Sequence, residues 1–315
     1  MTKIISIIIP CYNEAAVLDT LFSELAELAN RNKEYEFEFV CVDDGSQDST
    51  LSHLKEWAER DKRAVIVEFS RNFGKEPALS AGIDYASGDA VIPFDADLQD
   101  PPEVIDEMII EWEKGAEVVL AKRKDRSVDS PLKRMTANGF YRVHNAITSV
   151  KIPDNVGDFR LMDRVVVDAL KQMPERMRFM KGIFAWVGFS TVTVEYVRAK
   201  RAAGETKFSG WKLWNFAIEG VTSFSIFPLK IWSYIGGVVA ALCCVYGFYI
   251  LTRTIVFGVD LPGYASLLLS ILFLGSINLI GIGILGEYVG RIYFEVKGRP
   301  IYIVKNIHGQ SDSDE

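Results

Sequence analysis

The amino-acid sequence predicts an α/β fold with a mostly parallel sheet, followed by two helices long enough to cross a membrane. Three observations support this prediction. Short runs rich in Val, Ile and Phe alternate with amphipathic stretches through the first half of the chain. Polar clusters directly follow three of these runs. Two long uncharged segments lie close together near the C-terminus of a 315-residue chain that is 49% hydrophobic.

The apolar runs of the first half are typical of buried strands. They are nearly continuous rather than alternating, which indicates a parallel sheet covered on both faces. The predicted strands are Ile4–Ile9, Phe37–Val42, Ala64–Phe69, Ala90–Phe94, Glu117–Ala121 and, further on, Thr191–Val197. The predicted helices lie near Ala15–Asn30, Ser49–Arg60, Pro77–Ala86 and Pro102–Lys114.

Composition excludes several classes of function. The formal net charge of −7 argues against nucleic acid as a partner, because binding to a phosphate backbone needs a basic surface. The spacing of the cysteines fits neither a zinc site nor a disulfide framework; they are Cys11, Cys41, Cys243 and Cys244. The N-terminal apolar run is too short for a signal peptide and lacks a small-residue cleavage site. We therefore expect the large N-terminal part to stay in the cytoplasm.

Two segments near the C-terminus, Ser233–Thr252 and Leu261–Gly286, contain no charged residue. Each is close to the ~20 apolar residues that a membrane-spanning helix requires. The alternative is a pair of buried core helices, which fits less well because both segments lie together at one end of the chain. Positive charge flanks the outer ends of the pair, at Lys230, Arg291, Lys297 and Arg299. The positive-inside rule then places both ends of the hairpin in the cytoplasm.

The segment Trp211–Leu229 is aromatic and apolar with few charges. We interpret it as one or two interfacial helices in the headgroup layer, with an ordinary core helix as the alternative. The last residues, from His308, are polar and acidic, and we expect them to be disordered. The chain therefore divides into a cytoplasmic α/β domain at 1–210, interfacial helices at 211–230, two spans at 231–290 and a cytoplasmic tail at 291–315.

The strongest candidate for chemistry is the run from Asp95 to Asp100, which directly follows a predicted strand. Asp95 and Asp97 are spaced so that both carboxylates can reach one hard cation, such as Mg²⁺ or Mn²⁺. A cation there would offset the charge that builds on a departing diphosphate. A single D-x-D pair is weak evidence, because Asp is common in loops. Its position at a strand end strengthens it, since ligands bind at the carboxyl ends of strands in such sheets.

Two further polar clusters follow strands. Asp43 and Asp44 stand at the end of the second predicted strand, where their carboxylates suit hydrogen bonds to a base or to ribose hydroxyls. The residues after them read as a turn and a helix cap. After the first strand, Tyr12 and Glu14 can line a nucleoside pocket. Three clusters at one edge of a sheet indicate a site.

These motifs, in order and spacing, resemble family 2 glycosyltransferases of the GT-A fold. Within that family the chain is most similar to the polyprenyl-phosphate hexosyltransferases, including the bactoprenol glucosyltransferases of bacterial O-antigen modification. The resemblance covers nearly the whole chain, hairpin included. It is carried by P-C-Y-N-E, V-D-D-G-S-x-D-S-T, R-N-F-G-K, D-A-D-L-Q-D-P-P-E, A-K-R-K-D-R-S, G-D-F-R-L-M, F-M-K-G, Y-V-R-A-K-R, T-S-F-S and L-G-E-Y-V-G-R-I-Y.

The resemblance implies roles for individual residues. The nucleoside would be held by Pro10, Tyr12, Glu14, Val42 and Asp44. The metal and diphosphate would be bound by Asp95, Asp97 and Gln99, with Ala96 also in the donor-binding set. The phosphates would be contacted by Arg123, Arg134, Arg201 and Lys207. Cations suit these positions, because two phosphorylated substrates must meet there. The catalytic residues would be Asp97, Asp158 and Arg201.

Asp158 is the residue most often described as the general base in the family that this chain resembles. A phosphate acceptor, however, has a second pKa of ~6 and is already mostly a dianion at neutral pH. Asp158 would then orient Arg160 or a cation that binds the acceptor, and both readings stay open. One departure from related sequences is Phe208 in Thr206-Lys207-Phe208, where Ser-Lys-Tyr is common. The missing hydroxyl leaves that ring a packing role.

The resemblance implies an inverting transfer of glucose from UDP-glucose to undecaprenyl phosphate, with Mg²⁺ or Mn²⁺ as cofactor. The product would serve O-antigen or cell-envelope glycan modification. The protein would be a multi-pass protein of the bacterial inner membrane, with its catalytic domain and both termini in the cytoplasm. We also expect a homo-oligomer, because glycines in the spans allow close helix packing: Gly275, Gly281, Gly283 and Gly286.

Four alternative functions fit the sequence to different degrees. The same reaction with galactose, N-acetylglucosamine, mannose or a modified pentose is not excluded by any residue. A processive polysaccharide synthase would carry a Q-x-x-R-W motif and more spans, and this sequence has neither. A non-catalytic membrane scaffold disagrees with the intact Asp95, Asp97, Asp158 and Arg201. A flippase or channel would need an oligomer to line a path with two spans per chain.

Overall fold

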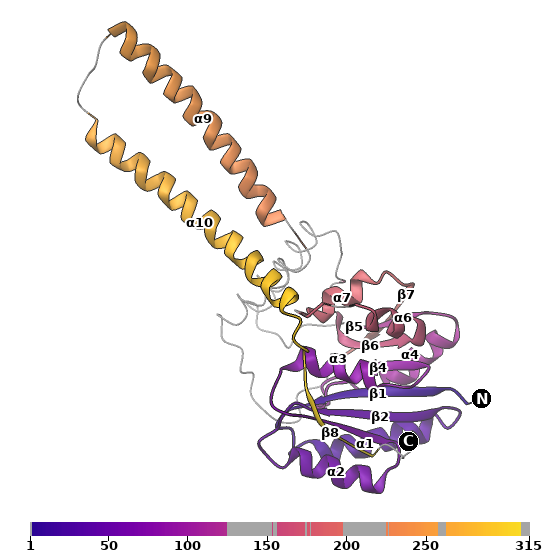
Figure 1. Ribbon diagram of the computed structural model, residues 1–315. Coiled ribbons are helices and arrows are strands. Elements are labelled where there is room, and N and C mark those ends of the chain that lie inside the picture. Colours follow the sequence, from indigo (N-terminus) through magenta and orange to yellow (C-terminus); the bar gives the residue numbers. More distant parts are fainter. Residues whose placement is uncertain are drawn as a thin grey trace.

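The computed structural model describes residues 2–124, 153, 156–173, 175–176, 178–197, 225, 227–257 and 263–309. Within these ranges the chain forms one eight-stranded sheet with helices on both faces (Figure 1). Two long helices project from the domain as a pair (Figure 1). The sheet, its covering helices and the projecting pair match the predicted α/β domain followed by a hairpin. The predicted interfacial helices at 211–230 lie outside the described residues, apart from residue 225 and the first residues of α9.

The sheet is mixed and mostly parallel. Its order is β7-β5-β6-β4-β1-β2-β3-β8. The strands are β1 (Ile4–Cys11), β2 (Glu36–Asp43), β3 (Ala64–Phe69), β4 (Ala90–Pro93), β5 (Val118–Arg123), β6 (Val156–Asp163), β7 (Thr191–Tyr196) and β8 (Val304–His308). Strands β6 and β8 run antiparallel to their neighbours, whereas the other pairs are parallel. The predicted strands are confirmed, and β6 and β8 are additions.

Helices bury both faces of the sheet. On one face lie α1 (Leu18–Arg31), α2 (Thr50–Arg60) and α4 (Val104–Glu113). On the other lie α3 (Lys75–Tyr85), α6 (Arg164–Lys171) and α7 (Met180–Trp186). In β1, Ile7 packs in the first core and Ile8 in the second, and both are fully buried. This two-sided burial is the physical reason for the continuous apolar runs in the sequence.

Helix α3 lies directly on β1. A Cβ atom at Gly82 would stand 1.8 Å from Cγ2 of Ile8, so only glycine permits this close approach. The position of α3 matters for the site, because its first residue is Lys75.

The two projecting helices are α9 (Phe227–Phe257) and α10 (Tyr264–Lys297). Their segments Leu229–Phe257 and Ser270–Lys297 are long and apolar enough to cross a membrane, judged by length and composition. At 1.5 Å per residue, the 34 residues of α10 extend about 51 Å, well beyond the ~30 Å of a hydrocarbon core. Helix α10 therefore continues past Gly286, where the uncharged segment ends.

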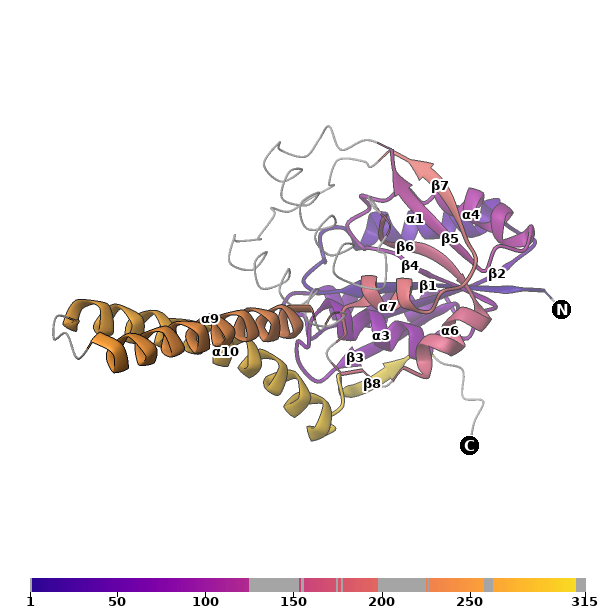
Figure 2. The same ribbon diagram turned by 90° about the horizontal axis from the view of Figure 1, so that it is seen from above.

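The C-terminal segment differs from the expected tail. After α10 the chain returns to the domain, and residues 304–308 form β8 beside β3 at the edge of the sheet (Figure 2). His308, the first residue of the predicted disordered tail, is the last residue of β8. The prediction is wrong for His308, because the polar side chains of this edge strand bind a buried carboxylate, Glu68. The rest of the predicted tail, from residue 310, lies outside the described residues.

Candidate active site

The loops that follow β1, β2 and β4 meet at one edge of the sheet. In the parallel register, Cys11 of β1 pairs with Asp43 of β2, and Ile8 of β1 pairs with Pro93 of β4. The three polar clusters predicted from the sequence therefore lie next to one another, as expected for the carboxyl edge of a parallel sheet.

Hydrogen bonds join the loop after β1 to the loop after β2. The Asn13 N–H donates to Ser46 Oγ at 3.0 Å, and the Gln47 N–H donates to Asn13 Oδ1 at 2.8 Å. The Glu14 N–H donates to Thr50 Oγ1 at 2.9 Å. Asn13 has a φ of 56°, a left-handed conformation that Asn tolerates. The two loops form one wall, which we call the neutral wall.

Two predicted nucleoside residues occupy this wall differently. Tyr12 is 42% exposed and is free to contact a ligand. Val42 is fully buried in the core beneath α3, so only its backbone can reach a nucleoside. Pro10 pairs with Val42 across the ladder, just before the strand ends. The structure thus brings the predicted nucleoside residues to one place, and their contacts with a nucleoside stay predictions.

Asp44 has a structural task that the sequence did not predict. One carboxylate oxygen accepts the Phe73 N–H at 2.6 Å and the other accepts the Gly74 N–H at 2.9 Å. Burial raises the pKa of Asp44, and these two bonds oppose that rise. Gly45 permits the approach of the next loop, because a Cβ there would stand 2.5 Å from the Arg71 carbonyl carbon. Asp44 thereby fixes the turn immediately before Lys75.

The loop after β4 presents the predicted metal ligands. Leu98 has a φ of 53°, and the Gln99 N–H donates to Asp97 Oδ1 at 3.2 Å, which folds the loop back on itself. Asp95 and Asp97 are partly exposed, whereas Ala96 and Gln99 are buried. Within the described part of the chain no group of three or more His, Cys, Asp or Glu side chains could hold a metal ion. Asp95 and Asp97 therefore do not form a complete set of protein ligands by themselves.

Lys75 joins this loop to β6. Its Nζ lies 2.7 Å from Asp95 Oδ1 and 3.2 Å from Asp158 Oδ2. Burial would lower the pKa of Lys75, but the two carboxylates outweigh burial and raise it. Lys75 belongs to the R-N-F-G-K run, but no local pattern predicts its place between two carboxylates. We call the group of Lys75, Asp95 and Asp158 the charged wall.

Asp158 stands on β6, inside the sheet. Burial raises the pKa of its carboxyl, but the charges of Lys75, Lys181 and Arg160 outweigh burial and hold it below the usual value. Its Oδ1 atom is buried and has no hydrogen-bond partner among the residues that the structure describes. A lowered pKa makes a poor proton acceptor at neutral pH, because an efficient base has a pKa near the working pH.

Arg160 makes no direct bond to the Asp158 carboxylate in the described structure. Its guanidinium donates to the backbone carbonyls of Gly157 at 2.7 Å and Asp158 at 3.4 Å, and it stacks on Phe184 at 4.1 Å. Burial lowers the pKa of Arg160 to about 10, although the nearby Asp158 charge opposes this. The charged side chain bonded directly to Asp158 is Lys75 rather than Arg160.

Arg123 lies beside the loop after β4, and its contact with a phosphate stays a prediction. Its Nε donates to the Tyr196 hydroxyl at 3.1 Å, and one of its Nη atoms lies 3.8 Å from Asp100. Tyr196 in turn donates to Asp100. These bonds fix the guanidinium at the end of β5, next to the loop that carries Asp95 and Asp97. The other predicted phosphate contacts lie outside the described residues; they are Arg134, Arg201 and Lys207.

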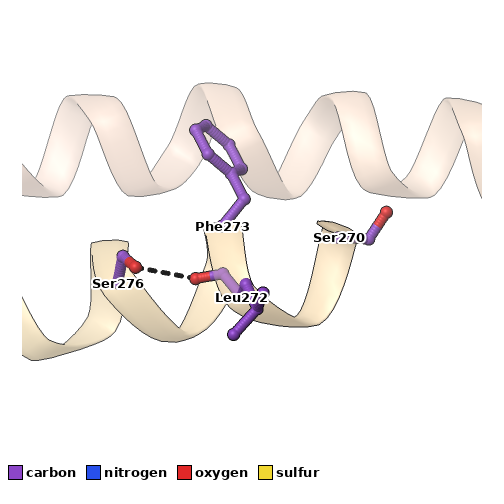
Figure 3. Close-up of a pocket in the computed structure, with 4 residues that line it drawn as sticks. All are labelled: Ser270, Leu272, Phe273 and Ser276. Atoms are coloured by element: carbon purple, nitrogen blue, oxygen red, sulfur yellow. Dashed lines mark hydrogen bonds between the residues drawn. The ribbon is translucent and has the colours of Figure 1, made fainter. Parts of the chain in front are cut away.

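Two hollows lie near this site and in the hairpin. One, of about 320 Å³, is lined by Phe73, Gly74, Lys75, Glu76, Pro77, Arg176, Arg178 and Ile301. It opens beside Lys75. The other, of about 410 Å³, lies along α10 and is lined by Ser270, Leu272, Phe273 and Ser276, with the Phe273 ring directed towards α9 (Figure 3). This second hollow is mainly apolar and offers no group for chemistry.

Comparison with protein families identifies two matching models. The model described as Glycosyl transferase family 2 matches residues 6–171, from β1 through α6. The model described as the GtrB C-terminal hairpin matches residues 227–292, which are α9 and most of α10.

Curated relatives match almost end to end. The SfII prophage-derived bactoprenol glucosyl transferase of Shigella flexneri is 56% identical over 304 residues, which are 96% of this chain and 98% of that protein. The prophage bactoprenol glucosyl transferase homolog of Escherichia coli (strain K12) is 56% identical over 303 residues, 96% and 99% of the two chains. Among solved structures, S. aureus TarS 1-349 in complex with UDP matches at a TM-score of 0.45 and 17% identity, over 62% of this chain and 59% of that one.

Proposed function

The chain belongs to glycosyl transferase family 2, and from that premise we propose that it transfers glucose from UDP-glucose to undecaprenyl phosphate. The relatives that match nearly its full length are bactoprenol glucosyl transferases by name. The observation that carries the proposal is the meeting of Asp95, Lys75 and Asp158 at the sheet edge of a domain with an apolar hairpin. A charged site on a domain that carries an apolar hairpin suits a reaction between a nucleotide sugar and a lipid phosphate.

The residues of the loop after β4 fit a divalent cation. Asp95 and Asp97 offer carboxylate oxygens and Gln99 an amide oxygen, which are the ligand types that Mg²⁺ and Mn²⁺ take. Because the described part of the protein offers only two carboxylates there, the remaining ligands of the cation would come from water and the diphosphate. When bound, the cation would offset the charge on the departing diphosphate. Arg123 lies beside this loop and adds a fixed positive charge.

The transfer itself needs charge and position more than a base. An oxygen of the acceptor phosphate forms a bond to C1 of glucose while the bond from C1 to UDP breaks, which inverts the configuration. The acceptor is mostly a dianion at neutral pH, because its second pKa is ~6. We therefore assign Asp158 to holding Lys75, whose ammonium would help offset the charge of the two phosphates.

We place the hairpin across the membrane with both of its ends on one side. The chain leaves the domain before α9 and rejoins the same sheet at β8, so the two ends of the hairpin share a side of the bilayer. Lys230, Arg291 and Lys297 lie at that end, which favours the cytoplasm. The catalytic domain and both termini would then be cytoplasmic, in the inner membrane of a bacterium.

A homo-oligomer remains a prediction, but Gly281 no longer counts among the glycines that support it. A Cβ at Gly281 would lie 2.0 Å from Nε1 of Trp232, so this glycine serves the packing of α10 on α9 within one chain. Gly275, Gly283 and Gly286 have nothing within 4 Å of a built Cβ among the described residues, and they stay available for contact between chains.

The experiment that tests the function is a panel of radiolabelled UDP-sugars. Membranes that contain the chain and undecaprenyl phosphate are incubated with UDP-glucose, UDP-galactose or UDP-N-acetylglucosamine, and the labelled lipid is identified. We expect label from UDP-glucose in a lipid that mild acid cleaves. Label from another sugar alone would overturn the glucosyl assignment, and no labelled lipid from any donor would favour a non-catalytic scaffold.

Two variants control the panel. Asp97→Ala should reduce lipid labelling by a factor on the order of 10³, because the site loses a ligand of a cation that supplies several kcal/mol. Glu27→Ala removes an exposed carboxylate in the second half of α1, away from the loops that form the site, and should label lipid at the rate of the natural protein. Labelling by Asp97→Ala at that rate in metal-buffered membranes would overturn the metal assignment.

A further inference from the structure

The segment that follows α10, residues 298–308, binds the membrane hairpin to the domain; we call it the strap. Helix α10 ends at Lys297, and Gly298 turns the chain with a φ of 67°. The Arg176 N–H donates to Glu295 Oε1 at 2.9 Å, and the Arg176 guanidinium donates to the Arg299 carbonyl. The end of α10 is therefore held by the loop that precedes α7, before the chain reaches the sheet.

The second half of the strap, strand β8, is held on the sheet by charged and polar side chains. Glu68 of β3 has a side chain only 3% exposed, yet it accepts from Lys305 at 2.6 Å and Asn306 at 3.2 Å and lies 3.1 Å from His308. Burial raises the pKa of Glu68, but these partners and Lys55 outweigh burial and lower it to about 2. A buried carboxylate with partners from β8 makes this strand specific to β3, beyond the backbone ladder.

The first half of the strap, before β8, contacts aromatic rings that lead towards the site. Tyr302 stacks on Phe69, with ring centroids 5.1 Å apart and planes at 9°. Phe69 in turn meets the edge of Phe73 at 5.6 Å. Phe73 is one of the two residues whose N–H groups Asp44 binds, and Lys75 follows two positions later. Ile301 lines the hollow that also contains Lys75.

Tyr302 also reaches the far end of α3. Its hydroxyl donates to Asp84 Oδ2 at 2.7 Å. Helix α3 begins at Lys75 and ends at Tyr85, so Asp84 lies in its last turn. The helix that presents Lys75 is therefore held at its start by Asp44 and at its end by the strap.

We propose that the strap is a positioning element for the transfer reaction: Tyr302, through Phe69, Phe73 and Asp84, sets where Lys75 stands between Asp95 and Asp158. The geometry of the charged wall is then coupled to the hairpin that meets the lipid acceptor. This proposal rests on the proposed function where activity is the readout. A simpler role, covering an exposed sheet edge, would need the β8 ladder but not the contacts of Tyr302.

The test compares three tyrosine variants of the full chain in lipid nanodiscs. Tyr302→Leu removes both the stack and the hydroxyl, and Tyr302→Phe removes the hydroxyl alone. Tyr35→Phe is the matched control, because the Tyr35 hydroxyl also binds a carboxylate, Glu113, at 3.2 Å, on a part of the surface with no role in the site. Glucose transfer gives kcat and the KM for UDP-glucose. Hydrogen exchange of the peptide that contains Phe73 and Gly74 reports the turn directly.

We expect Tyr302→Leu to lower kcat on the order of tenfold with KM within about twofold, because a misplaced group costs rate more than binding. Tyr302→Phe should recover most of the rate, and Tyr35→Phe should match the natural protein. Exchange at Phe73 and Gly74 should accelerate in Tyr302→Leu alone. If Tyr302→Leu keeps both its kcat and its exchange protection, the strap only covers an edge and the proposal is wrong.

The two readouts separate the two proposals. If the natural protein transfers no sugar but Tyr302→Leu accelerates exchange at Phe73, the proposed function fails and the coupling stands. If the natural protein transfers glucose and exchange is unchanged in Tyr302→Leu, the function stands and the coupling fails. Should Tyr302→Leu fail to fold, Asp84→Ala removes the partner of the hydroxyl from an exposed helix end. It should then show faster exchange in the last turn of α3, and unchanged exchange there would contradict the proposal.

Discussion

The two walls of the site are built from different interactions. The neutral wall, from the loops after β1 and β2, is held mainly by hydrogen bonds from backbone N–H groups to the uncharged side chains of Asn13, Ser46 and Thr50, with one longer bond to the Asp48 carboxylate. The charged wall is held by two ion pairs, from Lys75 to Asp95 and to Asp158. Hydrogen bonds within loops fix a shape, whereas ion pairs at an open edge can exchange one partner for a charged substrate.

This difference suggests how the work is divided. A wall whose two loops are already joined by hydrogen bonds should bind a nucleoside with little rearrangement, which favours affinity. A lysine between two carboxylates can respond to phosphate groups, because their charge competes for the same ammonium. Changes to the neutral wall should therefore act mainly on the KM for the donor. Changes to the charged wall should act mainly on kcat.

Among changes to the two walls, the largest effect is expected for Lys75→Met. This variant keeps most of the side chain's volume but leaves Asp95 and Asp158 without their cation, so we expect kcat for glucose transfer to fall on the order of 10²-fold. The KM for UDP-glucose should change by less than about threefold, since the neutral wall is untouched. Steady-state transfer rates in nanodiscs measure both constants, and a thermal melt reports how much protein is folded.

Lys3→Met is the matched control for this variant. The Lys3 side chain is 48% exposed and pairs with Glu113 at 2.8 Å, close to the 47% exposure of the Lys75 side chain. Lys3 directly precedes β1, so it lies at the amino ends of the strands, opposite to the site. We expect no change in kcat, because an exposed pair contributes little. Equal losses of kcat in the two variants would mean that Lys75 acts through stability and not at the site.

The sequence predicted the parts of the site that lie near one another along the chain. Asp95, Asp97 and Gln99 stand in one run after an apolar strand, so composition and spacing are enough to mark them. Lys75 carries no such local signal, because a lysine at the start of a helix usually faces solvent. Its role depends on Asp158, which comes from β6, and on a turn that Asp44 fixes through backbone bonds. Contacts of this kind follow from tertiary structure alone.

The fold shows the same limit. Strands β1 to β5 were predictable, because parallel strands buried on both faces are continuous in apolar residues. Strand β6 carries Asp158 and Arg160 within the sheet, and β8 has three exposed residues of five, so neither has the apolar pattern of a strand. Both run antiparallel to their neighbours, and β8 pairs with a strand far away in sequence, since Lys305 lies 237 residues after Glu68 of β3. Such strands are specified by their pairing partners, and the local sequence has no periodic apolar pattern from which they could be predicted.

A smaller effect, on pH dependence, is expected at Glu76. Burial and the Asp158 charge raise the pKa of Glu76 from 4.5 to about 7, although the Met180 N–H and the charges of Lys75 and Lys181 oppose the rise. An acid with a raised folded pKa binds more protons folded than unfolded, so stability should fall as pH rises from about 4.5 to about 7. Glu76→Gln should remove a stability loss of about 1–3 kcal/mol over that range.

Thermal melts of the full chain between pH 5 and pH 8 test this prediction. The natural protein should lose stability with rising pH, and Glu76→Gln should show a flatter profile. Glu59→Gln, an exposed glutamate on α2, should keep the profile of the natural protein. Should Glu76→Gln keep that profile as well, the pH dependence comes from another group.

The smallest effect is expected in the neutral wall, for Asn13→Gly. Glycine accepts the left-handed φ of 56° without strain, so the variant removes only the acceptor for the Gln47 N–H. Losing one such bond costs about 1 kcal/mol. That loss corresponds to a KM for UDP-glucose raised by about fivefold, with kcat within about twofold. Asn13→Ala would add backbone strain to the same loss and should raise KM further.

The kinetic assay used for Lys75→Met also tests the prediction for Asn13→Gly. A fall in kcat as large as that of Lys75→Met would show that the two walls act as one unit, whereas a change confined to KM separates binding from transfer at this site.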